Sequence, residues 1–521
     1  MTLHALLRFR RTRIAALCAV VLLAAAPAPV VWAQHRLPAL GDSASEDFGI
    51  GAERKVGDAI MREIRRDPDY IDDPLLLEYV QTMWTALLEA ARARGDIDVE
   101  IDERFAWEAF LVRDRSVNAF ALPGGYVGVH LGLIAMTATR DELASVLAHE
   151  LTHVTQRHIA RSIGTSRRQT LLSTAAMILG VLAASRANSP DMASAAIAGG
   201  QAASIQGQLN FSRDMEREAD RIGLGVMTDA GFAPAGMAAM FEKLAQAYRL
   251  NDSGSFPYLR SHPLTSERIG EARARLGAAS GTAPVSVLEH DLAQARARVL
   301  MDTRIDALRR WQALRVDDSA PRGERLATLY ANALASSLMR EHERAAASLA
   351  ALQTLQASGA KDTRVERAVA LLDVPLALAR DDLARARAAL SPYADDGSRP
   401  VSLLAARLAL AQPGDGAALK RSADRLQTRV AAHPNDAEAW LLASQLWGRL
   451  DQPLRSLRAE AEARLALGDI NGAVDRLRAG QRMARDAGRT DFIEASVIDA
   501  RLRDIEALQR ELAAEERRGG G

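Results

Sequence analysis

Two histidines and a glutamate lie within five residues of one another on one predicted helix. Apolar periodicity predicts this helix over residues 141–154, and it carries His149, Glu150 and His153. At about 100° per residue, His149 and His153 project from one face, one turn apart, so both imidazoles can bind a single Zn²⁺. Glu150 can then take a proton from a water molecule as that water attacks a substrate. The spacing predicts a zinc hydrolase site; the alternative is three buried polar side chains satisfied by ordinary core hydrogen bonds.

A site of this kind needs a third protein ligand and leaves a fourth position open. The candidates are Glu216 and Asp220, which lie one turn apart on a second predicted helix. This spacing suits one metal ligand and one carboxylate that orients a histidine N–H, and on spacing alone the two residues could exchange roles. His158 lies about 140° around the helix from His153 and cannot easily join the same metal. We therefore expect His158 to support a ligand or to have a structural role.

The composition of the chain indicates a globular, mostly helical protein. The chain has 521 residues, 48% of them hydrophobic and 25% charged, which excludes disordered and collagen-like classes. Lys+Arg and Asp+Glu both number 66, so the formal charge is zero and selects no polyanionic ligand. Aromatic residues make up only 4%, which argues against a protein that stacks on nucleic-acid bases. We expect no nucleic-acid partner.

The first 33 residues have the pattern of a secretory signal peptide. Basic residues precede an apolar run over 14–26, and the segment ends in a small residue, Ala33. The alternative is a transmembrane anchor, which would need about 20 apolar residues. The single cysteine, Cys18, lies inside this segment, so the mature chain would contain no thiol. These features predict an exported protein in the periplasm of a Gram-negative bacterium.

A second apolar region covers residues 169–212. Its first part is free of charge but short for a membrane span, and its second part is barely hydrophobic. We expect a lid or an amphipathic hairpin beside a cleft, with contact to a membrane as the alternative.

Strand character is confined to residues 105–130. Residues 105–112 alternate loosely, and a Pro-Gly-Gly turn signal at 123–125 divides the remainder. All other segments read as helix and loop. After a domain edge at 278–284, the chain is rich in Ala, Leu and Arg, with fragments similar to tetratricopeptide helix pairs. The alternative for this tail is a generic helical bundle.

Three motifs together resemble one family of enzymes. HExxHxxxxH, then SRxxExEAD, then His262-Pro263-Leu264 with Arg268, is similar to the zinc metallopeptidases related to HtpX and the CaaX prenyl proteases. The resemblance implies a gluzincin-type fold in which Glu216 is the third zinc ligand and Asp220 supports the site. It also implies that the peptide substrate lies along an edge strand. The matching residues of this strand are Asn118, Ala119 and Phe120.

Within this family, the signal peptide, single peptidase domain and helical tail resemble the BepA-like β-barrel assembly-enhancing proteases. The resemblance implies a periplasmic zinc endopeptidase that degrades misassembled envelope proteins and assists outer-membrane β-barrel assembly. Protein or peptide substrates and the outer-membrane assembly machinery are the implied partners, and one Zn²⁺ per chain is the implied cofactor. The alternative is a chaperone or scaffold that binds through its helical tail and has a latent peptidase site.

The resemblance also gives His262 and Arg268 roles. In BepA-like proteins the matching histidine is a switch that occupies the fourth zinc position and expels water. The other possibilities for His262 are a helix cap before Pro263 or a donor to the oxyanion. Arg268 is expected near the same cleft, to stabilise an anion or to position another group.

We therefore expect a mainly α protein in three parts. They are a signal peptide (1–33), a gluzincin-type zinc peptidase domain with a small β-sheet (34–280) and an all-α tetratricopeptide-like repeat domain (300–514).

Overall fold

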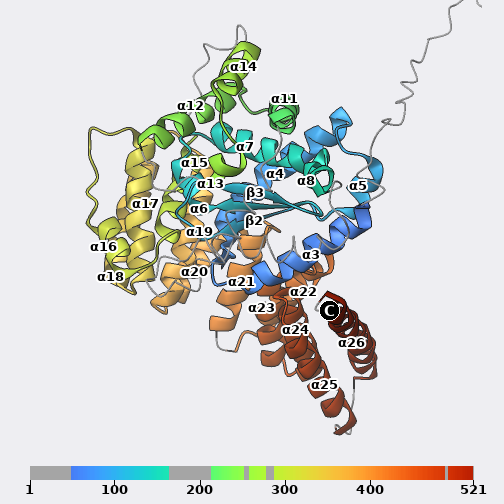
Figure 1. Ribbon diagram of the computed structural model, residues 1–521. Coiled ribbons are helices and arrows are strands. Elements are labelled where there is room, and N and C mark those ends of the chain that lie inside the picture. Colours follow the sequence, from blue (N-terminus) through green and yellow to red (C-terminus); the bar gives the residue numbers. More distant parts are fainter. Residues whose placement is uncertain are drawn as a thin grey trace, which may run out of the picture. The chain divides into compact units, whose positions relative to one another are not determined.

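A small mixed β-sheet lies among the helices of the amino-terminal half (Figure 1). The computed structural model describes residues 48–163, 213–250, 257–276, 287–412, 414–486 and 491–519. The strands are β1 (Tyr70–Ile71), β2 (Glu108–Val112), β3 (Ala119–Leu122) and β4 (Tyr126–His130). Their order is β1-β2-β4-β3, with β2 and β4 parallel and the other pairs antiparallel. One edge of the sheet is therefore β3, and the two-residue strand β1 had no clear signal in the sequence.

Helices cover both faces of this sheet because its side chains are apolar on both sides. In β2, Phe110 and Val112 pack with apolar residues of α3 (Ile50–Arg66) on one face. Leu111 points to the opposite face, as the two-residue repeat of a strand requires, and joins the core formed with α4 (Pro74–Arg94) and α7 (Arg140–Thr155). The predicted helix over 141–154 is thus the buried helix α7.

The turn between β3 and β4 places β3 at one edge of the sheet. Gly124 and Gly125 have φ angles of +78° and +90°, which glycine adopts without strain. The predicted turn signal is therefore a tight connection that returns the chain beside β3. The remaining helices of this half are α5 (Val99–Arg104), α6 (Leu131–Met136), α8 (His158–Ile163), α11 (Arg213–Asp229), α12 (Ala235–Leu250), α13 (Pro257–Ser261) and α14 (Ser266–Leu276).

From residue 287 onward, the described part of the chain is all helical. Each helix packs mainly against helices close to it in sequence (Figure 1), as expected for helix pairs. The assignment of these pairs as tetratricopeptide repeats stays a prediction. The elements are α15 (Leu288–Leu300), α16 (Ile305–Ala313), α17 (Arg322–Leu338), α18 (His342–Ala357), α19 (Thr363–Ala379), α20 (Leu383–Leu390), η2 (Ser391–Tyr393), α21 (Arg399–Ala411), α22 (Gly416–Ala432), α23 (Ala437–Arg449), α24 (Pro453–Ala466), α25 (Ile470–Asp486) and α26 (Phe492–Gly519).

The all-helical region is joined to α4 by apolar packing and by ion pairs. Apolar side chains of α15, α17, α18 and α19 belong to the same core cluster as those of α4 and α7. Three arginines of the helical region also reach carboxylates at the start of α4. The pairs are Arg296–Asp73, Arg367–Glu78 and Arg399–Asp72, with N–O distances of 2.6, 2.7 and 2.6 Å. Charge pairs of this kind fix one packing geometry, because breaking one leaves an uncompensated charge.

Several predictions fall on residues outside the described ranges. These are the signal peptide at 1–33, the apolar region at 169–212 and the domain edge at 278–284. Among the described residues, no helix is long and apolar enough to cross a membrane.

Candidate metal centre

Helix α7 holds the two histidines and the glutamate of the first motif in the protein interior. It begins after Thr139, whose hydroxyl accepts a hydrogen bond from the Glu142 N–H at 3.2 Å, while the Glu142 carboxylate accepts one from the Ala138 N–H at 2.6 Å. Such reciprocal capping gives the helix a defined start. His149, Glu150 and His153 are at most 1% exposed. The local sequence thus builds a rigid, dry helix that presents these side chains together.

Helix α11 brings the predicted carboxylates close to α7. A β-carbon placed on Gly223 would lie 3.1 Å from the backbone oxygen of Ala148, so a glycine here permits the two helices to approach closely. Glu216 and Asp220, earlier on α11, then face His149. The Glu216 carboxylate lies 3.4 Å from His149 Nε2, and the Asp220 carboxylate accepts a hydrogen bond from His149 Nδ1 at 3.0 Å.

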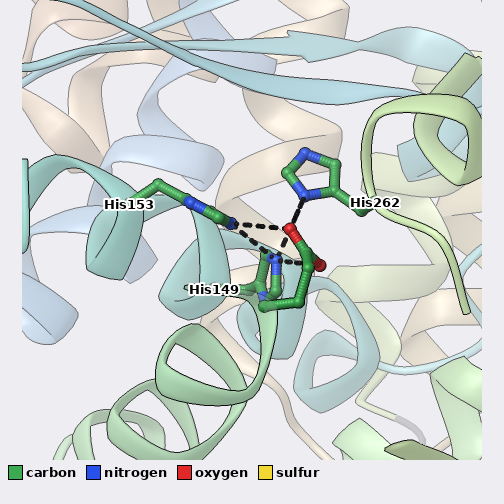
Figure 2. A group of neighbouring side chains, drawn as sticks. His149, His153 and His262 are labelled. Atoms are coloured by element: carbon green, nitrogen blue, oxygen red, sulfur yellow. Dashed lines mark hydrogen bonds and ion pairs between the residues drawn. The ribbon is translucent and has the colours of Figure 1, made fainter. Parts of the chain in front are cut away.

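Four side chains converge on one point. His149, His153, Glu216 and His262 each offer a ligand atom, and these atoms lie within 4.8 Å of one another. Figure 2 shows the three labelled imidazoles directed at a single carboxylate, which belongs to Glu216. The Nε2 atoms of His149 and His153 are 2.9 Å apart, and Glu216 lies 3.4 Å from each. These separations are close to the edge of a tetrahedron with zinc–ligand bonds of about 2 Å.

Hydrogen bonds on the far side of each ring orient the two α7 histidines. His149 donates from Nδ1 to Asp220. His153 Nδ1 lies 2.8 Å from Nδ1 of His158, whose Nε2 in turn lies 3.1 Å from the Glu218 carboxylate. If His158 donates to Glu218, it accepts from His153, and both α7 histidines then expose unprotonated Nε2 atoms to the same point. Two lone pairs 2.9 Å apart repel unless a proton or a metal ion lies between them, so these residues fit a metal ion once His149 has lost its second proton.

The charges of the centre also favour a cation. Burial alone would lower the pKa of His149, but Glu216 and Asp220 overcome this effect and raise the pKa to about 9. Burial lowers the pKa of His153 well below 6.5. Burial alone would raise the pKa of Glu216, yet the neighbouring His262 and His149 hold it far below its ordinary value. A metal must therefore displace a proton from His149, and binding is expected to strengthen as pH rises.

Arg268 lies behind the carboxylates and touches both of them. Its guanidinium donates to Asp220 at 2.7 and 2.8 Å and lies 2.8 Å from Glu216. It also donates to the carbonyl oxygen of Pro263, in the loop that carries His262. The guanidinium is thus engaged with groups that contact His149 and His262, and its role, to stabilise an anion or to position another group, stays a prediction.

Glu150 lies beside the centre without joining it. One carboxylate oxygen accepts a hydrogen bond from the Ala121 N–H of β3 at 3.0 Å. The other oxygen has no hydrogen-bond partner among the described residues and lies 3.4 Å from His262 Nε2. Burial raises the pKa of Glu150, which makes the carboxylate a stronger base. This arrangement leaves one oxygen available to accept a proton.

His262 occupies the fourth corner of the cluster. It follows α13, its Nδ1 lies 3.0 Å from Glu216 and 3.3 Å from His149 Nε2, and it is 1% exposed. The ring of Tyr258 stacks on it, with centroids 4.7 Å apart and planes tilted by 30°. With His262 in this position, all four corners of a tetrahedral site would be filled by protein, as in closed zinc sites.

The predicted substrate strand is β3, and its backbone has two different sides. The carbonyl oxygen of Asn118 accepts a hydrogen bond from His130 on β4, whereas the N–H of Ala121 points to Glu150. Because successive residues of a strand point to opposite edges, Phe120 turns its backbone toward β4, and Ala119 turns with Ala121 toward α7. Of the three predicted substrate-binding residues, Ala119 alone offers its backbone to the outer edge.

Sequence reasoning missed three groups at this centre. The Ala121 N–H could not be predicted, because every residue except proline has a backbone N–H and the residue type does not show which one contacts the site. Glu218 lies on the face of α11 that meets His158. A helical-wheel comparison of the segment with His158 and the segment with Glu218 could have indicated this contact. Tyr258 carries no motif and is placed against the centre only by the path of the chain through α13.

A buried histidine beside β3 makes folding sensitive to acid. Burial lowers the pKa of His130 to about 4, although Asp114 opposes the shift. An unfolded histidine titrates near 6.5, so the folded state binds the proton less well, and stability is lost as pH falls from 6.5 toward 4. In urea unfolding at pH 7.0 and 4.5, we expect His130→Asn to remove about 2–3 kcal/mol of this pH dependence. Equal losses of stability between the two pH values for the parent and for His130→Asn would contradict the assignment.

Known proteins are similar to this chain in sequence. Residues 81–276 match the sequence model of peptidase family M48. The match runs from α4 to α14 and contains every predicted site residue, and it confirms the predicted resemblance to zinc metallopeptidases. The matched region is followed by the all-helical region, so the predicted mainly α fold with a small β-sheet is confirmed, whereas the tetratricopeptide assignment stays a prediction. M48 peptidases are zinc-dependent, and the buried cluster has the donor set that zinc requires.

Curated relatives match the same half of the chain. The provisionally named beta-barrel assembly-enhancing protease of Vibrio cholerae is 39% identical over 265 residues, which are 51% of this chain and 52% of that protein. The beta-barrel assembly-enhancing protease of Escherichia coli strain K12 is 35% identical over 239 residues, 46% of this chain and 47% of that protein. Mitochondrial metalloendopeptidase OMA1 of Saccharomyces cerevisiae is 28% identical over 218 residues, 40% of this chain and 59% of that protein. The chain thus spans about half the length of the curated relatives it matches.

Proposed function

We propose that this chain is a zinc-dependent endopeptidase of the bacterial periplasm, which degrades misassembled envelope proteins and assists β-barrel assembly in the outer membrane. The observation that carries the proposal is the convergence of His149, His153 and Glu216 on one point, with the free oxygen of Glu150 beside it. The matched relatives named beta-barrel assembly-enhancing protease support the choice of substrate.

His149, His153 and Glu216 would hold the zinc ion, and Asp220 and His158 would orient the two imidazoles. When bound, zinc supplies Lewis-acid chemistry: it polarises a carbonyl group and lowers the pKa of water. Glu150 takes a proton from the attacking water as the new C–O bond forms, and passes it to the amine nitrogen as the C–N bond breaks. Arg268 holds Asp220 and Glu216 in place and compensates their negative charge.

The substrate would bind in an extended conformation along the outer edge of β3. The backbone of Ala119 lies between Val117, which bonds to α13, and Ala121, which bonds to Glu150 of α7. Main-chain pairing with a strand edge accepts many sequences, which suits an enzyme that degrades misassembled proteins. Asn118 and Phe120 would then contribute through their side chains, and the tetratricopeptide-like helices would recruit substrates or the outer-membrane assembly machinery.

The resting enzyme is latent in this proposal, because His262 fills the corner where a substrate carbonyl or water must enter. We expect His262→Ala to increase the basal rate of casein cleavage by the zinc-loaded chain, with zinc content unchanged. The measurement is the initial rate of release of fluorescein-labelled peptides, next to metal analysis of the same sample. As a control, His342→Ala on α18 should leave the rate unaltered. A lower rate for His262→Ala with full zinc would instead favour an oxyanion or capping role.

The closed fourth corner also supports the second candidate, a chaperone or scaffold that binds through its helices while the peptidase site is silent. The two functions differ in their dependence on metal. If the chain is a peptidase, removal of zinc with a chelator abolishes cleavage and zinc restores it. If it acts only as a scaffold, the purified chain does not cleave casein even when it is loaded with zinc and His262 is replaced.

A further inference from the structure

Unsatisfied polar atoms gather around the metal centre. Three buried side-chain atoms there have no hydrogen-bond partner among the described residues. They are Asn118 Oδ1, Glu150 Oε1 and the hydroxyl of Tyr258. A buried polar atom without a partner costs free energy, so its retention indicates that a ligand or substrate completes it.

Tyr258 is distinct within this group because its hydroxyl can donate a hydrogen bond. The amide oxygen of Asn118 and the carboxylate of Glu150 can only accept. Replacing Tyr258 by phenylalanine would remove this hydroxyl and leave the rest of the side chain unchanged. A phenylalanine would fill the same volume and would spare the burial of an unpaired polar group, and Tyr258 is only 2% exposed.

The position of Tyr258 points its ring at the reacting corner. The ring stacks on His262 and meets His149 edge-on, with centroids 6.4 Å apart. Its backbone nitrogen lies 3.4 Å from the carbonyl oxygen of Val117, two residues before the edge strand β3 begins. Tyr258 therefore bridges the strand along which the substrate would bind and the corner that His262 fills.

We propose that the Tyr258 hydroxyl is a catalytic hydrogen-bond donor, which binds the carbonyl oxygen of the scissile peptide as negative charge develops on it. This inference rests on the proposed function. For Glu150 to act, the scissile carbonyl must lie against Glu150 and the metal ligands, at the corner that Tyr258 flanks. The phenol keeps its proton throughout, since an ordinary tyrosine is neutral at pH 7, and the hydrogen bond strengthens with the charge on the oxygen.

The test is Tyr258→Phe, which keeps the ring and removes only the hydroxyl. In zinc-loaded protein we expect kcat for casein cleavage to fall by about 10²–10³-fold, with KM within about twofold, because the interaction forms in the transition state. Zinc content should stay at one per chain. The melting temperature should stay equal or rise, because the hydroxyl has no partner to lose in the resting state.

A matched control removes a buried hydroxyl that does have a partner. The Tyr330 hydroxyl accepts a hydrogen bond from Arg296 at 2.9 Å, far from the metal centre, and Tyr330 is likewise 2% exposed. Tyr330→Phe should lower the melting temperature by about 3 °C and leave kcat unchanged. The two variants should thus show opposite patterns of stability and rate.

A second experiment, in protein that already carries His262→Ala, distinguishes a catalytic role of Tyr258 from a role in which Tyr258 only positions His262. In His262→Ala protein, a catalytic hydroxyl still contributes, so the added Tyr258→Phe change should again lower kcat. The inference is overturned if Tyr258→Phe leaves kcat unchanged, if it acts only when His262 is present, or if its loss of rate comes with loss of zinc or of stability. If neither the parent nor His262→Ala cleaves casein with zinc bound, the proposed function fails, and this inference fails with it.

Discussion

Replacement of Glu150 by glutamine is expected to lower kcat by about 10²–10⁴-fold while the chain keeps its zinc. Glutamine has the same shape and can still accept the hydrogen bond from the Ala121 N–H, but its amide cannot take a proton from water. Glu150 is not among the cluster atoms, so metal binding does not depend on it. Casein cleavage and zinc content measured on the same preparation check both parts.

The exposed Glu267 provides the matched control for this change. It lies at the beginning of α14, next to Arg268, and pairs with Arg217 at the surface. Glu267→Gln removes the same charge and should leave both rate and zinc unaltered. If Glu150→Gln cleaves casein as fast as the parent, general-base catalysis by Glu150 is wrong. If it loses cleavage but still supports outer-membrane assembly in cells, binding rather than proteolysis carries that part of the function.

Replacement of Glu216 by glutamine is expected to remove most of the zinc. Glu216 is the one carboxylate of the cluster, and a neutral amide is a far weaker zinc ligand. The change also leaves the guanidinium of Arg268 without one of its two carboxylates. We expect substoichiometric zinc after dialysis, and cleavage that returns only at high added zinc.

Asp214→Asn is the control on the same helix. Asp214 is 93% exposed and lies two residues before Glu216, so the variant makes the same chemical change away from the centre. It should retain one zinc per chain. If Glu216→Gln also retains zinc, the third ligand is Asp220, the alternative that spacing left open; Asp220→Asn should then lose the metal.

Residues close together in the sequence could be assigned to the site without a structure. His149 and His153 share a face because their separation of one turn is a property of any helix, whatever it packs against. The helix over 141–154 and the small sheet at 105–130 likewise follow from local periodicity and from the glycine turn. The mainly α fold with a small sheet was predictable for this reason, whereas the two-residue strand β1 was too short to leave a pattern.

Contacts between distant segments were decided by packing. Glu216 and Asp220 were equivalent in spacing, and their different positions depend on how closely α11 approaches α7 at Gly223. The inward ring of His262 and the hydroxyl of Tyr258 depend on the course of α13. Residue types along a chain encode local geometry directly, but the meeting of remote side chains depends on the angles and separations of many packed elements. That convergence arises only when the whole domain has folded.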